Sequence, residues 1–167
     1  MIAYSLLIIF PAVMIMAALS DLLTMTIPNR LSIILVASFA PLAVVAGLPI
    51  ESFLMHLAVG AGILGVGFLL FSIGTLGGGD AKLLAAAGLW IGAANLLTFL
   101  LYVAVVGGAL ALCILLYRRL PMAAAAAGPA WAFRLHGKET GIPYGIAIAG
   151  AALLTFAQTE LYALILN

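Results

Sequence analysis

Long apolar segments without a charged residue constrain this chain more than any other feature of its sequence. From Leu83 to Tyr117 no residue is charged, and over the whole chain only 7% are. The hydrophobic share is 67% and the mean hydropathy is +1.37. Since a soluble domain has about 25% charged residues, the composition predicts an integral membrane protein that forms a single domain, residues 1–167.

A helix that crosses a bilayer needs about 20 mostly apolar residues, and four segments outside the uncharged run meet this requirement. They are Ile2–Leu19, Leu31–Leu48, Phe53–Ile73 and Ile142–Leu166. As one helix, Leu83–Tyr117 would be about 52 Å long, whereas the hydrocarbon core is only ~30 Å thick. This run is therefore either one overlong, tilted helix or two helices with a turn near "WIGAAN", residues 90–95.

The basic residues decide between these alternatives, because short cytoplasmic loops carry an excess of Lys and Arg. With one helix in the run, two basic residues would face the other four across the membrane. With two helices, all six fall on one side: Arg30, Lys82, Arg118, Arg119, Arg134 and Lys138. We therefore predict an all-α polytopic fold with about six transmembrane helices and both termini outside. The segment Lys82–Ile91 would be a short span that its neighbours shelter.

Two aspartates lie at matching positions in this topology. Asp21 falls at the inner end of the first helix, and Asp80 falls at the inner start of the fourth. Carboxylates at membrane depth are costly, so they are candidates for a functional site. We therefore expect the two side chains to lie at the same depth and to form a site together.

A helix-breaking element adjoins each aspartate. Pro28 and Asn29 follow Asp21, where proline blocks helix continuation and asparagine suits a turn or cap. Three glycines precede Asp80, and we expect them to adopt backbone conformations closed to other residues. These glycines are Gly77, Gly78 and Gly79.

Two neighbouring carboxyls that share one proton are able to activate water and protonate a carbonyl oxygen. This chemistry is that of an aspartic protease, and it needs no metal and no cofactor. Two alternatives remain from the residues alone. Each aspartate is equally suited to capping a helix at the membrane surface, and the pair would also suit a small proton- or cation-coupled transporter or a membrane scaffold. Transporters, however, place such groups nearer the midplane.

The remaining composition excludes several other classes of function. A net charge of +1 argues against a nucleic-acid surface, which needs a basic patch. The single cysteine, Cys113, excludes an intrachain disulfide and a multi-cysteine zinc site. No nucleic-acid partner is expected, and the apolar composition makes the lipid bilayer the expected surroundings of the chain.

Three sequence elements occur together in one order. "DLLTMTIPN", Asp21–Asn29, fits the pattern D-x5-I-P-N, and "GGGD", residues 77–80, fits G-x-G-D with Lys82 two residues later. "IPYGIAIA", Ile142–Ala149, fits P-x-G-x-A. With these elements the chain resembles the prepilin peptidase family, the G-x-G-D membrane aspartic proteases that mature type IV pilins.

The resemblance implies that Asp21 and Asp80 are the catalytic pair. It implies a prepilin substrate whose short, positively charged leader is cleaved at the cytoplasmic face of the bacterial inner membrane. Larger members carry paired C-x-x-C elements and also N-methylate the product. This chain begins directly with a span and has one cysteine, so it is similar to the short members of Flp-type (tight adherence) pilus systems, and methylation is not implied.

Other polar residues near these elements have two interpretations each. Lys82 contacts the catalytic loop or marks the cytoplasmic boundary. Asn29 orders the first loop or caps the second helix. We expect Pro143, Tyr144 and Gly145 to shape the start of the last helix near the site. His56, near the outer end of the third helix, is expected to serve packing.

Overall fold

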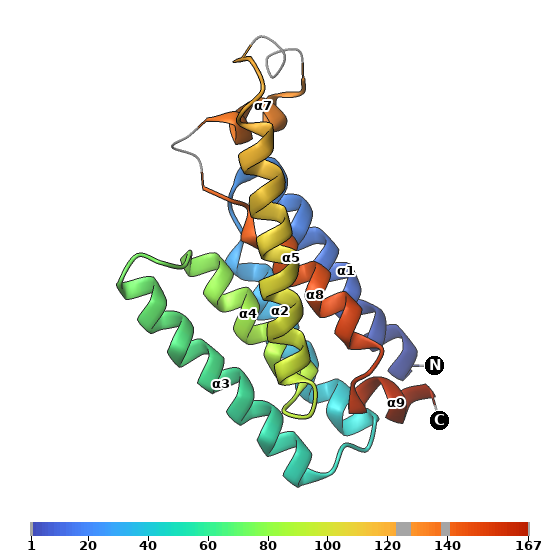
Figure 1. Cartoon of the computed structure of the whole chain (residues 1–167). Coiled ribbons are helices and arrows are strands. Elements are labelled where there is room, and N and C mark those ends of the chain that lie inside the picture. Colours follow the sequence, from blue (N-terminus) through green and yellow to red (C-terminus); the bar gives the residue numbers. More distant parts are fainter. Residues whose placement is uncertain (1, 123–127, 138–140, 167) are drawn as a thin grey trace.

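A computed structural model describes residues 2–122, 128–137 and 141–166 (Figure 1). Helices joined by turns make up this part of the chain, and no strand occurs in it. The predicted all-α class is therefore confirmed. Lys138 lies outside the described residues, so its expected position is not addressed by the structure.

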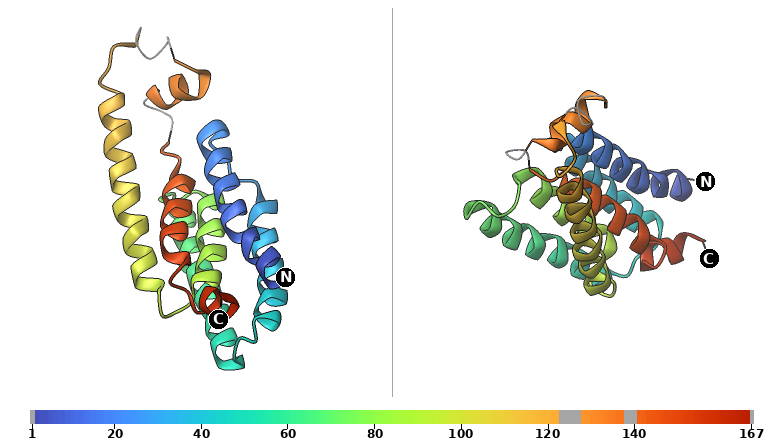
Figure 2. Two further views of the ribbon diagram at one scale, coloured as in Figure 1. Left: turned by 90° about the vertical axis from the view of Figure 1, so that its right-hand side faces the viewer. Right: turned by 45° about the horizontal axis from the view of Figure 1, so that its top comes forward.

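The long helices run alternately up and down in one bundle (Figures 1 and 2). The start of α1 and the end of α9 lie at the same end of this bundle, and α7 lies at the opposite end. In chain order the helices are α1 Ile2–Thr24, α2 Asn29–Val45, α3 Ile50–Ser72, α4 Gly78–Ile91, α5 Leu96–Tyr117, α7 Ala130–His136, α8 Tyr144–Phe156 and α9 Glu160–Leu166.

The short helix α4 is the most enclosed element of the bundle. It packs against α2, α3, α5 and α8, and every residue from Leu83 to Ile91 except Leu84 is buried. At about 1.5 Å per residue its 14 residues measure only ~21 Å. The neighbouring helices surround it, as expected for a short helix that needs shelter.

Aromatic side chains fill the core at the end of α4 that is remote from Asp80. Trp90 is fully buried and stacks on Phe10 of α1, with ring centroids 5.1 Å apart. Phe10 also stacks on Phe156 of α8 at 4.5 Å. The Nε1–H of Trp90 donates to the carbonyl oxygen of Leu35 in α2 at 2.9 Å. These contacts fix α1, α2, α4 and α8 to one another and satisfy the only polar atom of the indole.

The uncharged run from Leu83 to Tyr117 is broken between Ile91 and Leu96, so the two-helix alternative is confirmed. Gly92 ends α4 with a φ of 76°, which is left-handed and favours glycine. A Cβ there would also lie 2.5 Å from Cε1 of His56. The Nδ1 of His56 is hydrogen-bonded to the Leu89 carbonyl oxygen at 2.7 Å, a contact that fits the expected packing role.

The last predicted span, Ile142–Leu166, is wrong as one helix. It consists of α8 and α9, which meet at a bend of 47°. The cause is a cap, since the hydroxyl of Thr159 accepts a hydrogen bond from the Tyr162 N–H at 3.3 Å and so starts a new helix. A hydropathy average over the whole segment hides this break, although the polar residues Gln158, Thr159 and Glu160 mark it in the sequence.

Three of the described helices are long and apolar enough to cross a membrane, or four if α8 and α9 count as one broken span. The three are α1, over Leu7–Thr24, with α3 and α5. Helix α2 has 17 residues and α4 has 14, both shorter than a full span. The chain is thus a multi-pass membrane protein by helix length and composition, while the number six stays a prediction.

Close packing between α3 and α4 gives a test of the fold. A Cβ at Gly67 would lie 3.0 Å from Cβ of Ala81, whereas a Cβ at Gly65 on the same helix has no neighbour within 4 Å. We expect Gly67→Val to destabilise the protein by about 1–3 kcal/mol through overpacking. Thermal unfolding in detergent should show a lower midpoint for this variant.

Gly65→Val is the matched control, because both changes alter helix propensity equally. Its midpoint should stay within experimental error of the unsubstituted protein. Equal midpoints for the two variants would contradict the α3/α4 packing described above.

Candidate active site

Asp21 lies in the last turn of α1 and is buried, with 5% of its surface exposed. Its Oδ2 accepts a hydrogen bond of 2.7 Å from the backbone N–H of Gly145. Gly145 is in the first turn of α8, where backbone N–H groups have no partner inside the helix. The start of α8 therefore supplies the donor that a buried carboxylate needs.

Helix α1 ends soon after Asp21 for a local reason. Met25 has a φ of 56°, a left-handed conformation that stops the helix, and its N–H donates to the Asp21 carbonyl oxygen at 2.8 Å. The hydroxyl of Ser20 then donates to the Thr26 carbonyl oxygen at 2.9 Å. This turn brings Pro28 to the N-cap position of α2 and holds Asp21 at the helix end.

Asp80 lies in the first turn of α4, three residues after the N-cap Gly77. Its Oδ1 is buried and has no hydrogen-bond partner among the described residues. A buried acceptor without a partner costs about 1–3 kcal/mol, and such atoms in a native fold call for an explanation in terms of function or bound water. An oxygen ready to receive water or substrate provides that explanation.

The structure brings Asp21 and Asp80 to the same end of the bundle, close enough for their charges to interact. Ile27 lies between the elements that carry them. A Cβ at Gly145 would lie 2.8 Å from both Asp21 Oδ2 and Ile27 Cδ1, and one at Gly79 would lie 3.2 Å from Ile27 Cβ. The start of α4, the start of α8 and the loop after α1 therefore meet around one side chain.

The explanation expected for the glycines before Asp80 was wrong. Gly77 has a φ of −68°, and none of the three is among the residues with positive φ. The glycines instead allow neighbouring side chains to approach the backbone closely. A Cβ at Gly77 would lie 2.7 Å from Asp80 Oδ2. At Gly78 it would lie 3.3 Å from the Phe71 ring. A side chain at Gly77 would compete directly with the carboxyl.

A cavity of about 700 Å³ adjoins Asp80. Tyr144, predicted to face the site, lines this cavity together with Arg118 from the end of α5. The Nε of Arg118 donates to the Leu135 carbonyl oxygen at 2.8 Å, and its Nη2 donates to the Gly141 carbonyl oxygen at 3.3 Å. Through these two hydrogen bonds the guanidinium holds Leu135 and Gly141, which precede α8, next to the cavity.

Arg118 was predicted only to mark the inner side of the membrane. Its position at the end of an uncharged helix, on the same side as the G-x-G-D element, was the signal that could have identified it. The described residues contain no group of three or more His, Cys, Asp or Glu side chains placed to hold a metal ion.

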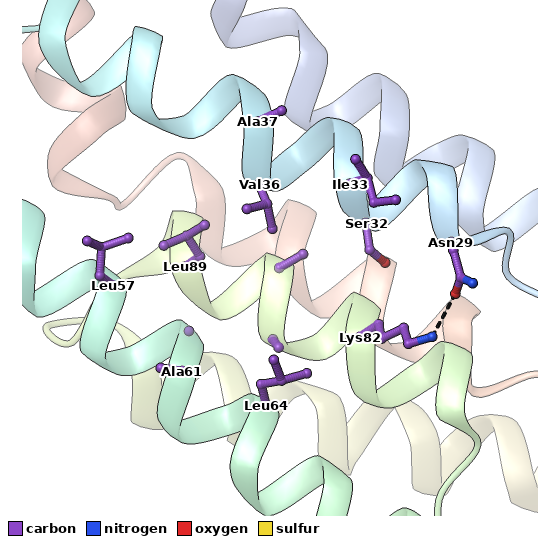
Figure 3. A pocket seen from close by; sticks show the side chains of 13 residues that line it. Asn29, Ser32, Ile33, Val36, Ala37, Leu57, Ala61, Leu64, Lys82 and Leu89 are labelled. Atoms are coloured by element: carbon purple, nitrogen blue, oxygen red, sulfur yellow. Dashed lines mark hydrogen bonds between the residues drawn. The ribbon is translucent and has the colours of Figure 1, made fainter.

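Of the other predicted site residues, Gly77 also lines the cavity, whereas Pro143 and Lys82 do not. Pro143 occupies the N-cap position of α8, directly before the residues that contact Asp21 and the cavity. Lys82 is not among the residues that line the cavity beside Asp80, and its Nζ donates to Oδ1 of Asn29 at 2.9 Å (Figure 3). Lys82 therefore contacts the residue that ends the first motif and ties α4 to α2.

The sequence model of the type IV leader peptidase family matches residues 8–112, more than half of the chain. The chain belongs to the type IV leader peptidase family. The matched region includes both aspartates and ends before the P-x-G-x-A element. Searches among curated proteins and among solved structures gave no significant match. Family membership makes this multi-pass protein a protease of the type IV leader peptidase kind.

The contact between Gly145 and Asp21 gives a test of the site. In Gly145→Ala the new Cβ would lie 2.8 Å from Asp21 Oδ2, so the carboxyl must move. Because a displacement of about 1 Å is able to cost 10²-fold in rate, we expect leader-peptide cleavage to fall by one to two orders of magnitude. Cleavage by detergent-purified protein measures this.

Gly150→Ala in the same helix is the control, since its Cβ would meet Val106 at an ordinary 3.7 Å. It should cleave at the unsubstituted rate. Full activity in Gly145→Ala would show that the position of Asp21 does not depend on this contact.

Proposed function

We propose that this chain is an aspartic endopeptidase that removes the leader peptide of type IV prepilins, with Asp21 and Asp80 as the catalytic pair. The observation that carries the proposal is the buried Oδ1 of Asp80, which has no hydrogen-bond partner among the described residues and lies close enough to Asp21 for the two charges to interact. Membership of the leader peptidase family supports the reaction class. The cavity beside Asp80 provides room for a peptide segment.

The proposed mechanism uses one proton shared by two carboxyls. The ionised carboxyl accepts a proton from a water molecule, and the resulting hydroxide equivalent attacks the scissile carbonyl carbon. The protonated carboxyl donates its proton to the carbonyl oxygen, which gives a tetrahedral gem-diol. As this collapses, the carboxyl that took the proton from water passes it to the leaving nitrogen, the other carboxylate accepts a proton from one gem-diol hydroxyl, and the C–N bond breaks. Oδ2 of Asp21 accepts a hydrogen bond from the Gly145 N–H. The other oxygen of Asp21, Oδ1, is therefore the one that would accept and donate the proton.

We further propose that the site faces the cytoplasm of a bacterium, in an inner-membrane protein with six passes and both termini outside. Four described basic residues at the starts of α2 and α4 and the end of α5 support this orientation, because the excess of Lys and Arg marks the cytoplasmic side. They are Arg30, Lys82, Arg118 and Arg119. A prepilin, by our proposal of the Flp type, would lie beside the helices by its own apolar segment.

The transporter alternative finds less support. Asp21 lies in the last turn of α1 and Asp80 in the first turn of α4, whereas transporters bind their cargo near the bilayer midplane between helices. Two acids at helix ends suit a reaction at the membrane boundary.

Conservative amide substitutions test the catalytic pair. We expect Asp21→Asn and Asp80→Asn each to reduce prepilin processing by about 10²–10⁴-fold, since each removes one partner of the acid–base pair. The double variant should be hardly worse than either single one, because residues that act as a unit are not additive. Co-expression with a prepilin and the electrophoretic shift of leader removal measure all three.

Glu51→Gln is the matched control, an exposed carboxylate in the first turn of α3 at the opposite end of the bundle. It should process normally. If both aspartate variants still remove the leader, the protease mechanism proposed for this pair is wrong.

A further inference from the structure

A second cavity lies on α4 and shares no described lining residue with the cavity beside Asp80. It is a groove of about 580 Å³ whose floor is α4 and whose walls are α2 and α3 (Figure 3). We call it the α2/α3 groove, formed by residues of 29–37, 57–64 and 82–89. It has no part in the mechanism proposed above.

Carbon atoms line almost the whole α2/α3 groove. Its floor is formed by small and apolar side chains, Ala85, Ala86 and Leu89. Ile33 on one wall and Leu64 on the other are 64% and 47% exposed, so the groove is open on the side that faces away from the bundle. Because α3 is long and apolar enough to cross the membrane, this opening faces hydrocarbon.

The polar groups of the groove are confined to one end, where Asn29, Ser32 and Lys82 lie (Figure 3). The ammonium of Lys82 carries three donors, and one of them is used by the amide oxygen of Asn29 at 2.9 Å. That partner is neutral, so this contact does not neutralise the positive charge of Lys82. An anionic oxygen above the groove would complement this charge.

We propose that the α2/α3 groove binds one acyl chain of an anionic phospholipid, with the lipid phosphate paired to Lys82. An alkyl chain with an anion at one end matches an apolar groove with a cation at one end. The volume falls within the ~300–1,000 Å³ of ordinary small-molecule sites. A peptide helix, about 10–12 Å across, would place only its side chains in such a groove.

The charge also favours lipid over substrate as the occupant. A positively charged leader would bring like charges together at Lys82, whereas an anionic headgroup near a membrane surface gains about 1 kcal/mol per Lys or Arg. The acyl chain itself gains little, because it leaves one hydrocarbon environment for another. Selectivity therefore depends on the headgroup, and phosphatidylglycerol should be preferred over phosphatidylcholine of identical chains.

Native mass spectrometry of the full chain, purified from a mixture of these two lipids, tests the proposal. We expect one retained phosphatidylglycerol, preferred at least about fivefold, the factor that corresponds to ~1 kcal/mol. Glycerol phosphate, which has no acyl chain, should not displace it. Equal retention of the two lipids would overturn the proposal.

Two pairs of variants separate the charge from the groove. Lys82→Gln keeps a donor for Asn29 but should abolish the headgroup preference, whereas Arg119→Gln, at an exposed basic residue just after the end of α5 and outside the groove, should keep it. Ala61→Phe fills the groove and should lose the retained lipid, whereas Ala58→Phe, on the same helix outside the groove, should retain it. Unchanged retention in Ala61→Phe would place the lipid elsewhere.

A photoreactive residue at Val36, which lines the groove, identifies the occupant in membranes that also contain a prepilin. Crosslinks to phospholipid are expected. Crosslinks to the prepilin in place of lipid would contradict this proposal while leaving the proposed protease function intact, because the readouts here do not depend on cleavage.

Discussion

The hydrogen bond from the Gly145 N–H to Asp21, which joins residues 124 positions apart, is the interaction on which the candidate site depends. A buried carboxylate needs donors, and an apolar chain offers few side chains that supply them. Unused N–H groups at a helix start are the available source. Helix α8 must therefore begin beside Asp21, and Pro143 at its N-cap and a glycine at position 145 make that approach possible.

The burial of α4 explains how one short helix serves two different cavities. Positions 80 and 82 are roughly 200° apart around a helix of 3.6 residues per turn, so Asp80 and Lys82 point to opposite sides. Asp80 lines the cavity next to Tyr144, and Lys82 lines the groove between α2 and α3. The contacts of Trp90 fix the end of α4 that is remote from Asp80. The first turn of α4 is held in place by packing against the neighbouring helices.

Features that depend on charge distribution or on local helix-breaking residues could be predicted from the sequence. The break after Ile91 followed from the distribution of basic residues, and the positions of Asp21 and Asp80 at helix ends followed from Pro28 and the adjacent glycines. Features that depend on distant contacts could not. The bonds of Arg118 to Leu135 and Gly141 and the bond of the Gly145 N–H to Asp21 join residues far apart in the sequence, so they require knowledge of packing.

The central claim is that the side chains at positions 21 and 80 meet at one site. Cysteines at these positions, in a chain whose only native cysteine, Cys113, is replaced by serine, allow a direct measurement in native membranes. A short bifunctional thiol reagent should join positions 21 and 80 within one molecule, and it should not join 80 to a cysteine at exposed position 51 at the other end of the bundle. Failure to join 21 and 80, with both thiols reactive toward a small maleimide, would contradict the account.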